Sequence, residues 1–479
     1  MKKIILPLVL CFVATAALFA DNGLESGYNI KIKLDGYTKD TLFIAYHFGD
    51  KQYIKDTLVR QPDGIFVFKG AEKLECGVYL VVMRPNNNYF QVLVSDNEQR
   101  FALEAHQDNP TESIKFTGAP DNKLFYEYLN YLGDKRPLAD TLRAQVDRTT
   151  DEAKKKILQD KLDKLNIDVE KYQAEMVTKH AGTLTSAIIK ANLPFVTPEF
   201  DGTTEEEKQI KKWRYTRDHY FDNLDVTDPC MLRTPFLFQR IEYFIQKLHV
   251  QHPDSISIAV DEVLEKLRPS PETFKFYLIH FLNYYARSNI VGMDAVYVHM
   301  VDKYYATGQA PWTEEEQLKK IIDNANTLRP ILIGKIAPDI KLQKRDGTPF
   351  SLHEVDSEYT ILYFWRHDCG HCKKSTPIMK EFYEKFKDKG VKLVAVCAKF
   401  TDEIPKCWEY VDENHLENWI QAVDPYHRSR FSTIYDLKST PQIFVLDRKK
   451  EILSKKIGAE QLEELMNKII EMKQKQSHN

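Results

Sequence analysis

The period of the hydrophobic residues changes twice along this chain of 479 residues, and that change limits the possible folds more than any other feature. Residues 21–118 cluster or alternate β-branched and aromatic residues between turn residues, as strands do. Residues 119–330 place apolar residues at steps of three and four, as helices do. Residues 331–479 alternate short apolar runs with helical segments. The sequence therefore predicts three domains: all-β, all-α and α/β.

The first two domains carry no obvious chemistry. The segments YNIKIKLDG, TLFIAYHF, IFVFKG, GVYLVVMR, NYFQVLVS and SIKFTG predict an antiparallel sandwich or barrel over residues 21–118. Residues 119–330 predict seven to nine helices punctuated by prolines. His280 and His299 lie in helical segments, and we interpret them as packing or surface residues rather than ligands. A structural or docking role is expected for both domains.

The first twenty residues, MKKIILPLVLCFVATAALFA, predict a secretory signal peptide over residues 1–20. Lys2 and Lys3 precede an apolar stretch that is shorter than a membrane span, and small residues end at Ala20. Cys11 follows large residues and lies too early for a lipoprotein signal, which argues against lipidation. The protein is therefore expected in the periplasm or cell envelope, with no membrane span once the signal is removed.

The overall composition is that of an ordinary globular protein, with 43% hydrophobic and 29% charged residues. The formal net charge of −3 provides no basic field for nucleic acid. Six cysteines follow the signal peptide, which are too few for a disulfide scaffold in an exported chain of this length. A pair of them at close spacing is therefore more plausibly chemical than structural.

Two of these cysteines stand three positions apart in the stretch FWRHDCGHCKKSTP, residues 364–377. The apolar run YTILYFW before them predicts a buried strand, and the residues after them predict a helix. Cys369 would then lie at a helix N-terminus, where free N–H groups and the helix dipole favour a thiolate. Cys372, one turn later, could attack a mixed disulfide formed by Cys369.

Two prolines complete this pattern. Pro377 falls inside the predicted helix, where it is expected to kink the axis. Thr440-Pro441 precedes the apolar strand QIFVLD and is a candidate cis peptide bond, because it ends a loop that delivers a strand edge beside the cysteines.

Residues from about 331 to 475 resemble the thioredoxin-fold domain of exported thiol–disulfide oxidoreductases of the TlpA/ResA type. The resemblance is carried by GKIAPDI, Phe364-Trp365, the CGHC motif, Pro377 and Thr440-Pro441. It implies that Cys369 is the attacking thiol and Cys372 the resolving one. It also implies that Pro441 is the cis-proline and that the backbone of Thr440 binds the substrate chain. The three-domain layout resembles multidomain exported proteins of Bacteroidetes.

The sequence departs from that family at two positions. Thioredoxins and disulfide isomerases carry an acidic residue six positions before the first cysteine, where this chain has Tyr363. The residue before the first cysteine is commonly Trp, and here it is Asp368, whose carboxylate should oppose ionisation of Cys369. The neighbouring residues Arg366, His367 and Lys373 oppose that effect, and the sequence does not decide the balance. His371 resembles the histidine of the disulfide isomerase motif and is expected to stabilise the thiolate. Because Tyr363 stands in place of the acidic residue, proton transfer from Cys372 must use another group or water.

Other uses of these cysteines fit less well. A c-type haem site needs histidine where this chain has Lys373, and a peroxiredoxin needs Thr or Ser where it has Arg366. A zinc site needs two more ligands, for which Cys397 and Cys407 are the candidates. We interpret Cys397 as a core thiol and Cys407 as an ordinary helix residue. Copper handling stays open, and the sequence does not decide whether Cys76, Cys230, Cys397 or Cys407 form disulfides.

These observations favour an exported enzyme that exchanges disulfides with cysteine-containing substrate proteins, without cofactor or metal. Its expected site comprises Cys369, Cys372 and His371, with Thr440 and Pro441 for substrate and with Trp365, Asp368, Pro377 and Tyr363 nearby. The direction of electron flow stays open, and a membrane thiol reductase of the DsbD kind is the partner implied for reduction. The alternative is an envelope binding protein whose thioredoxin-like domain is secondary or redox-degenerate.

Overall fold

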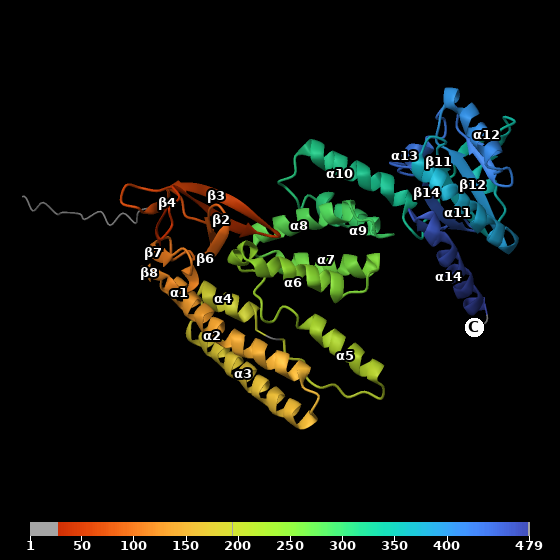
Figure 1. Ribbon diagram of the computed structural model, residues 1–479. Coiled ribbons are helices and arrows are strands. Elements are labelled where there is room, and N and C mark those ends of the chain that lie inside the picture. Colours follow the sequence, from red (N-terminus) through yellow and green to blue (C-terminus); the bar gives the residue numbers. More distant parts are fainter. Residues whose placement is uncertain (1–26, 194, 478–479) are drawn as a thin grey trace, which may run out of the picture. The chain divides into compact units, whose positions relative to one another are not determined.

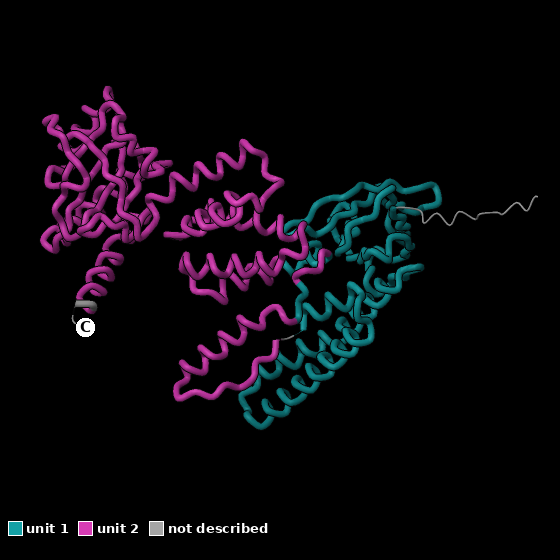
Figure 2. The backbone as a smooth tube through the Cα atoms, turned by 180° about the vertical axis from the view of Figure 1, so that it is seen from behind, with its two compact units in different colours: residues 1–194, 223–225, 230–237 teal, residues 195–222, 226–229, 238–479 magenta. Residues whose placement is uncertain are grey.

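The computed structural model describes residues 27–193 and 195–477, so the predicted signal peptide lies outside the described residues. Among these residues, no helix combines the length and the apolar character that a membrane crossing needs. The chain forms two compact units, shown in teal and magenta in Figure 2. One comprises residues 1–194, 223–225 and 230–237, and the other comprises residues 195–222, 226–229 and 238–479.

The first unit begins with two four-stranded sheets, ordered β4-β1-β7-β8 and β3-β2-β5-β6. Their strands are β1 (Tyr28–Asp35), β2 (Thr41–Phe48), β3 (Lys51–Val59), β4 (Phe66–Gly70), β5 (Gly77–Met83), β6 (Asn88–Val94), β7 (Arg100–His106) and β8 (Lys115–Thr117), with the short helix α1 (Pro110–Ser113) before β8. Phe68 of one sheet and Tyr79 of the other lie 6.5 Å apart between ring centroids, which joins the two sheets through their apolar faces.

The prediction of a wholly antiparallel arrangement is wrong at one pair, because β1 and β7 run parallel, with Ile32 opposite Leu103. Strands β3 and β7 were also absent from the predicted set. Strand β3 is the edge of its sheet, and Leu58 is its one buried residue, so it shows no apolar alternation. An edge strand of this kind is held by backbone hydrogen bonds to one neighbour, which leave little trace in the sequence.

Nine α-helices, α2–α10, lie between residues 119 and 330 of the part of the chain that is described, in agreement with the predicted seven to nine. They are α2 (Pro120–Arg148), α3 (Glu152–Lys179), α4 (Leu184–Ala191), α5 (Glu205–Asp218), α6 (Pro235–Lys247), α7 (Pro253–Leu267), α8 (Pro271–Ala286), α9 (Asp294–Met300) and α10 (Glu315–Leu328). Both helical histidines pair with carboxylates at 2.9 Å, His280 with Glu242 and His299 with Asp261. They lie within the packing of the helices, as predicted.

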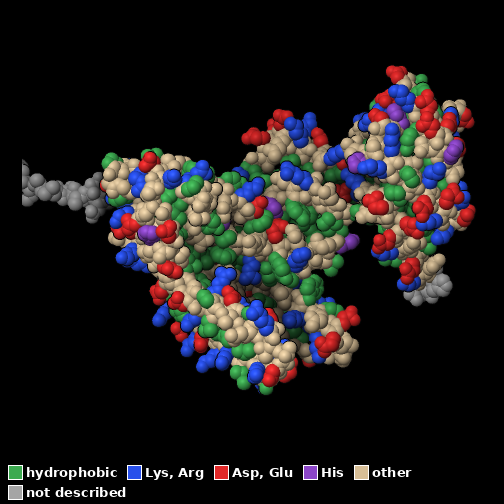
Figure 3. Space-filling view, in the orientation of Figure 1, with side chains coloured by type: hydrophobic (Ala, Val, Ile, Leu, Met, Phe, Trp, Pro, Cys, Tyr) green, Lys and Arg blue, Asp and Glu red, His purple; other side chains and the backbone are tan. Residues whose placement is uncertain are grey.

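The start of α2 is fixed to the first unit's sheets by buried polar groups. Asn122 accepts a hydrogen bond from the backbone N–H of Leu93 at 2.8 Å and donates one to its carbonyl, also at 2.8 Å. Because both groups are buried, each bond replaces water that the folded chain excludes. Figure 3 shows basic and acidic side chains interspersed over the visible face, as expected for a chain with a small net charge.

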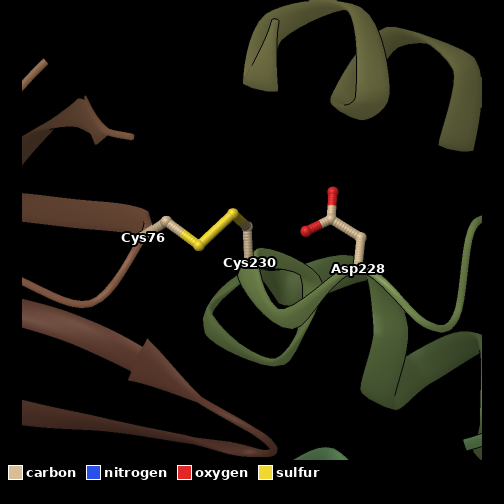
Figure 4. Close-up of side chains that lie close together, drawn as sticks. All are labelled: Cys76, Asp228 and Cys230. Atoms are coloured by element: carbon tan, nitrogen blue, oxygen red, sulfur yellow. A yellow bond between two sulfur atoms is a disulfide. The ribbon is translucent and has the colours of Figure 1, made fainter. Parts of the chain in front are cut away.

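A disulfide joins Cys76, just before β5, to Cys230, which lies 154 residues later (Figure 4). The chain after Cys230 packs tightly on the first sheets, because the Gly49 N–H donates to the Leu232 carbonyl at 3.0 Å. A β-carbon at position 77 would overlap Arg233, so Gly77 allows this approach. The sequence left this pairing open, and it was the fold that brought the two sulfurs together.

The C-terminal region is an α/β domain with a seven-stranded sheet ordered β10-β9-β13-β12-β11-β14-β15. Its strands are β9 (Lys341–Gln343), β10 (Pro349–Ser351), β11 (Tyr359–Trp365), β12 (Val391–Cys397), β13 (Ile420–Val423), β14 (Gln442–Asp447) and β15 (Ile452–Lys455). Its helices are α11 (Gly370–Phe386), α12 (Ile404–Glu413), α13 (Phe431–Ile434) and α14 (Ala459–Ser477). Figure 1 labels β11, β12, β14 and the helices α11–α14 in the blue, C-terminal part of the chain.

The central strand β11 is buried along its whole length and separates two layers. Ile361 and Tyr363 on one side join a core with Met379 of α11 and Leu462 of α14. Phe364 on the other side stacks on Phe431 of α13 with ring centroids 5.4 Å apart. A strand that is apolar on both faces is thereby covered on both faces, which holds its C-terminal end in place.

Cys397 at the end of β12 and Cys407 of α12 form a second disulfide. The predictions that Cys397 is a core thiol and Cys407 an ordinary helix residue are therefore wrong. The two residues lie ten positions apart, and their apolar neighbours hid the pairing. Strand β12 and helix α12 pack into one core, where both sulfurs are buried.

The two disulfides lie in different compact units, so removal of one is a control for removal of the other. We expect Cys76→Ala with Cys230→Ala to destabilise the first unit by about 2–5 kcal/mol, because the cross-link restricts the unfolded chain. Hydrogen exchange followed by mass spectrometry would show faster exchange in strands β5 and β6. The matched pair Cys397→Ala with Cys407→Ala should leave those strands unchanged. Equal exchange in the first variant and the wild type would contradict the expectation.

Candidate active site

The two cysteines of the CGHC motif lie at the junction of β11 and α11. Cys369 is the N-cap residue of α11, and its Sγ accepts a hydrogen bond from the backbone N–H of Cys372 at 3.3 Å. Both thiols are free, and their exposure differs: Cys369 is partly exposed, and Cys372 is 0% exposed. The site therefore combines one sulfur that a second molecule can reach with one that it cannot.

The surroundings move the pKa values of the two thiols in opposite directions. Burial by itself would raise the pKa of Cys369, but hydrogen bonds from Cys372, from the Thr440 side chain and from the backbone N–H of His371 outweigh burial and lower it. Burial raises the pKa of Cys372 to about 12, and its hydrogen bond with Cys369 adds to the increase. At neutral pH the exposed sulfur is thus the one that ionises more readily.

The loop before β14 lies against Cys369. The Thr440–Pro441 peptide bond is cis, as the sequence predicted. The Sγ–H of Cys369 donates to the Thr440 carbonyl at 3.2 Å. This contact with the carbonyl requires the thiol form, whereas the hydrogen bonds from Cys372 and from the Thr440 side chain favour the thiolate. Thr440 is therefore brought next to the exposed sulfur from 71 residues further along the chain.

A network of charged groups surrounds the residue before Cys369. Arg366 donates two hydrogen bonds to the Asp368 carboxylate, at 3.1 and 2.9 Å. Lys399 lies 2.9 Å from the same carboxylate and 2.8 Å from Glu403, and His367 lies 3.4 Å from Glu403. Arg366 and then Lys399 hold the pKa of Asp368 well below its usual range. Asp368 is thus an ionised but paired carboxylate.

Sequence reasoning did not identify Lys399 and Glu403. A usable signal was present: the chain runs from β11 through the helix α11 to β12, strands joined in this way pair in parallel, and their carboxyl ends then meet at one edge of the sheet. The register places Trp365 opposite Cys397, so the residues that follow each strand face each other. Lys399 follows β12 by two residues, as His367 follows β11.

Tyr363 and Trp365 lie on the buried side of the site. Tyr363 is 1% exposed, its hydroxyl has no hydrogen-bond partner among the described residues, and burial raises its pKa far above the neutral range. Trp365 packs against Tyr410, with ring centroids 5.2 Å apart. The Tyr410 hydroxyl donates to Thr376, which donates to the Cys372 carbonyl at 3.0 Å. Hydroxyl groups thus line the buried side of the site.

His371 and Pro377 lie on the outer side of α11. The His371 side chain is exposed on the first turn, and its backbone N–H contributes to the low pKa of Cys369. The helix continues through Pro377 to Phe386. Cys397 and Cys407 are bonded to each other, so neither offers a thiolate for the zinc site considered from the sequence.

Three family models match successive parts of the chain. Redoxin matches residues 332–470, and two domains of unknown function, DUF5106 and DUF4369, match residues 164–328 and 28–125. Among solved structures, a domain of a possible thiol-disulfide isomerase from Cytophaga hutchinsonii is 30% identical, with a TM-score of 0.28. It covers 30% of this chain and 97% of its own. A thioredoxin-like protein from Bacteroides caccae is 17% identical, with a TM-score of 0.45, and covers 57% of this chain and 97% of its own.

Curated relatives match the same C-terminal region. The thiol-disulfide oxidoreductase ResA of Bacillus cereus is 31% identical over 140 residues, which are 29% of this chain and 78% of that protein. ResA of Bacillus anthracis gives the same identity and coverage. The resemblance on which the sequence prediction rested is thereby confirmed, and this chain belongs, through its thioredoxin-like region, to the ResA family of thiol–disulfide oxidoreductases.

Proposed function

We propose that this protein is an exported oxidoreductase that exchanges disulfides with cysteine-containing substrate proteins through Cys369 and Cys372. The observation that carries the proposal is the opposite environment of the two sulfurs. Cys369 is partly exposed and has a lowered pKa, whereas Cys372 is buried and has a raised one. An accessible thiolate begins the exchange, and a protected thiol reacts only when a mixed disulfide forms beside it.

In the reducing direction the exchange has two steps. The Cys369 thiolate attacks one sulfur of a substrate disulfide, forms a mixed disulfide and releases the other substrate sulfur as a thiolate. Cys372 then loses its proton, attacks the Cys369 sulfur and releases the second substrate thiolate, which takes up a proton. Two electrons pass to the substrate, and Cys369 and Cys372 end as a disulfide. Oxidation of a substrate dithiol is the reverse sequence.

Thr440 and Pro441 are proposed to hold the substrate chain during the first step. The Thr440 carbonyl lies 3.2 Å from the Cys369 sulfur, so a chain attached to that sulfur would pass beside it. The carbonyl's present bond to the thiol is lost when Cys369 ionises, which leaves it available to a substrate N–H.

Export and electron flow belong to the same proposal. Export rests on the predicted signal peptide over residues 1–20. Reduction of substrates would require a membrane thiol reductase of the DsbD kind to renew the dithiol. The Gly370-His371 pair favours oxidation or isomerisation instead, with a potential between about −270 mV, as in thioredoxin, and about −180 mV, as in disulfide isomerase. Equilibration of the purified protein with glutathione buffers would measure it.

Cysteine variants test the proposed activity directly. We expect the reduced protein to reduce insulin, Cys369→Ser to abolish the reaction, and Cys372→Ser to accumulate mixed disulfides on Cys369. Mass spectrometry of proteins trapped by Cys372→Ser in cells would identify the substrates. The variant with both cysteines replaced is the matched control, because it should trap nothing. A folded wild-type protein that reduces neither insulin nor a small disulfide would contradict the proposal.

The asymmetry of the two thiols predicts their alkylation. At pH 7 iodoacetamide should modify Cys369 first and leave Cys372 unmodified, because the thiolate is the reactive form. As the pH rises, the rate should increase through a midpoint below the ordinary pKa of a cysteine thiol. Mass spectrometry of short reactions would locate the label. A midpoint above that value, or equal labelling of both cysteines, would disagree with the described geometry.

The unpartnered Tyr363 hydroxyl predicts a role in the second step. Its raised pKa keeps it protonated, so it can donate to a Cys372 thiolate but cannot act as a base. We expect Tyr363→Phe to slow release from the mixed disulfide about tenfold, the effect of one hydrogen bond to a charged group. The rate of attack by Cys369 should not change. Stopped-flow mixing with a fluorescent disulfide separates the two steps, and a slower first step would contradict this role.

A further inference from the structure

A buried ammonium group lies beside the loop that carries Cys369. Lys399 is 7% exposed, and its Nζ lies 2.9 Å from the Asp368 carboxylate and 2.8 Å from that of Glu403. Burial opposes the charge on Lys399, but the two carboxylates outweigh it and raise its pKa. A lysine is seldom buried unless its charge is used in such pairs. Here one of the two partners is the residue next to the reactive sulfur.

The position of Lys399 is set by covalent and backbone contacts. The N–H of Ala398 donates to the carbonyl of Trp365 at 2.8 Å, which continues the pairing of β12 with β11. The disulfide between Cys397 and Cys407 brackets the segment that holds Lys399 and Glu403. The ammonium group is therefore delivered to Asp368 by a rigid edge of the sheet and not by a mobile surface chain.

The charged and titratable groups around Cys369 come from several elements. They are Arg366, His367 and Asp368 in the preceding loop, Tyr363 on β11, His371 and Cys372 on α11, and Lys399 and Glu403 after β12. Four of these groups are ionised, and their formal charges sum to zero: Arg366, Asp368, Lys399 and Glu403. Without Lys399 they sum to one negative charge, and a negative charge beside a thiol opposes its ionisation.

We propose that Lys399 is a positioning residue for Cys369, acting through Asp368: it holds and neutralises that carboxylate, so that no unpaired negative charge faces the forming thiolate. The inference rests on the proposed role of Cys369 as the attacking thiol. It explains how this chain can carry the carboxylate of Asp368 directly before its attacking thiol. The acidic residue is tolerated because the neighbouring strand supplies a cation for it.

The test is the pH profile of Cys369 alkylation in the reduced full-length protein. We expect Lys399→Met to raise the midpoint by about 0.5–1 pH unit, as loss of a neighbouring positive charge does. Below the midpoint the rate should fall about two- to threefold. The fraction of thiolate decreases, but a more basic thiolate is a better nucleophile, and this partly offsets the decrease. Above pH 10 the same variant should react as fast as the wild type or faster. A merely structural defect would lower the rate at every pH.

Further variants isolate the pathway through Asp368. Lys399→Arg should restore the wild-type midpoint, because it keeps the charge. In an Asp368→Asn background, Lys399→Met should move the midpoint by less than half as much, since the carboxylate next to Cys369 is gone and only Glu403, which is not adjacent to Cys369 in the chain, loses its partner. Lys385→Met is the matched control, because Lys385, further along α11, pairs with Glu381 of the same helix and Glu463 of α14 and should not affect the midpoint.

Two results would overturn the inference: an unchanged midpoint in a folded Lys399→Met protein, or the same shift with and without Asp368. Circular dichroism and the hydrogen exchange of β11 establish that the variants are folded. The alkylation readout needs no protein substrate, so failure of the proposed function is seen separately. A protein that shows the predicted midpoints but reduces neither insulin nor a small disulfide would refute the proposed function and retain the role of Lys399.

Discussion

The hydrogen bond from the Cys372 N–H to the Cys369 sulfur is the contact on which the site depends. It makes the first cysteine the cap of its own helix, so the group that begins the reaction also satisfies a free N–H of α11. The bond exists because only four residues, 366–369, separate the end of β11 from the start of α11. The layers that bury both faces of β11 hold that junction in place, so the packing of the domain and the reactivity of the thiol have one origin.

Burial then separates the roles of the two sulfurs. One turn of helix carries the chain from the partly exposed Cys369 to the fully buried Cys372, and desolvation acts more strongly on the second thiol. Charged residues outside the CGHC motif also act on the ionisation of Cys369. Asp368 alone would work against Cys369, but Arg366 and Lys399 pair with it. The motif thus provides the sulfurs, and the sheet edge around it provides the electrostatics.

Much of this was predictable. An apolar run before CGHC, a helix after it and Thr440-Pro441 upstream of a strand led to the fold, the helix cap and the cis bond. Such features depend on residues near one another or on a single proline. By contrast, the disulfide between Cys76 and Cys230 depends on a contact across 154 residues. The parallel pairing of β1 with β7 depends on the topology of the sheet. Strand β3 was missed because an exposed edge strand has no apolar period to detect.

The sequence by itself determined the three types of domain, the order of the elements in the last one and the two sulfurs of the site. These follow from local periodicity and motif spacing, which act over a few residues. Only the tertiary structure decided that Cys397 and Cys407 are paired, that Tyr363 has a buried and unpartnered hydroxyl, and that Lys399 meets Asp368. The reason is physical: burial and charge pairing act through space, and the distances that set them appear only when strands distant in sequence meet at one edge of a sheet.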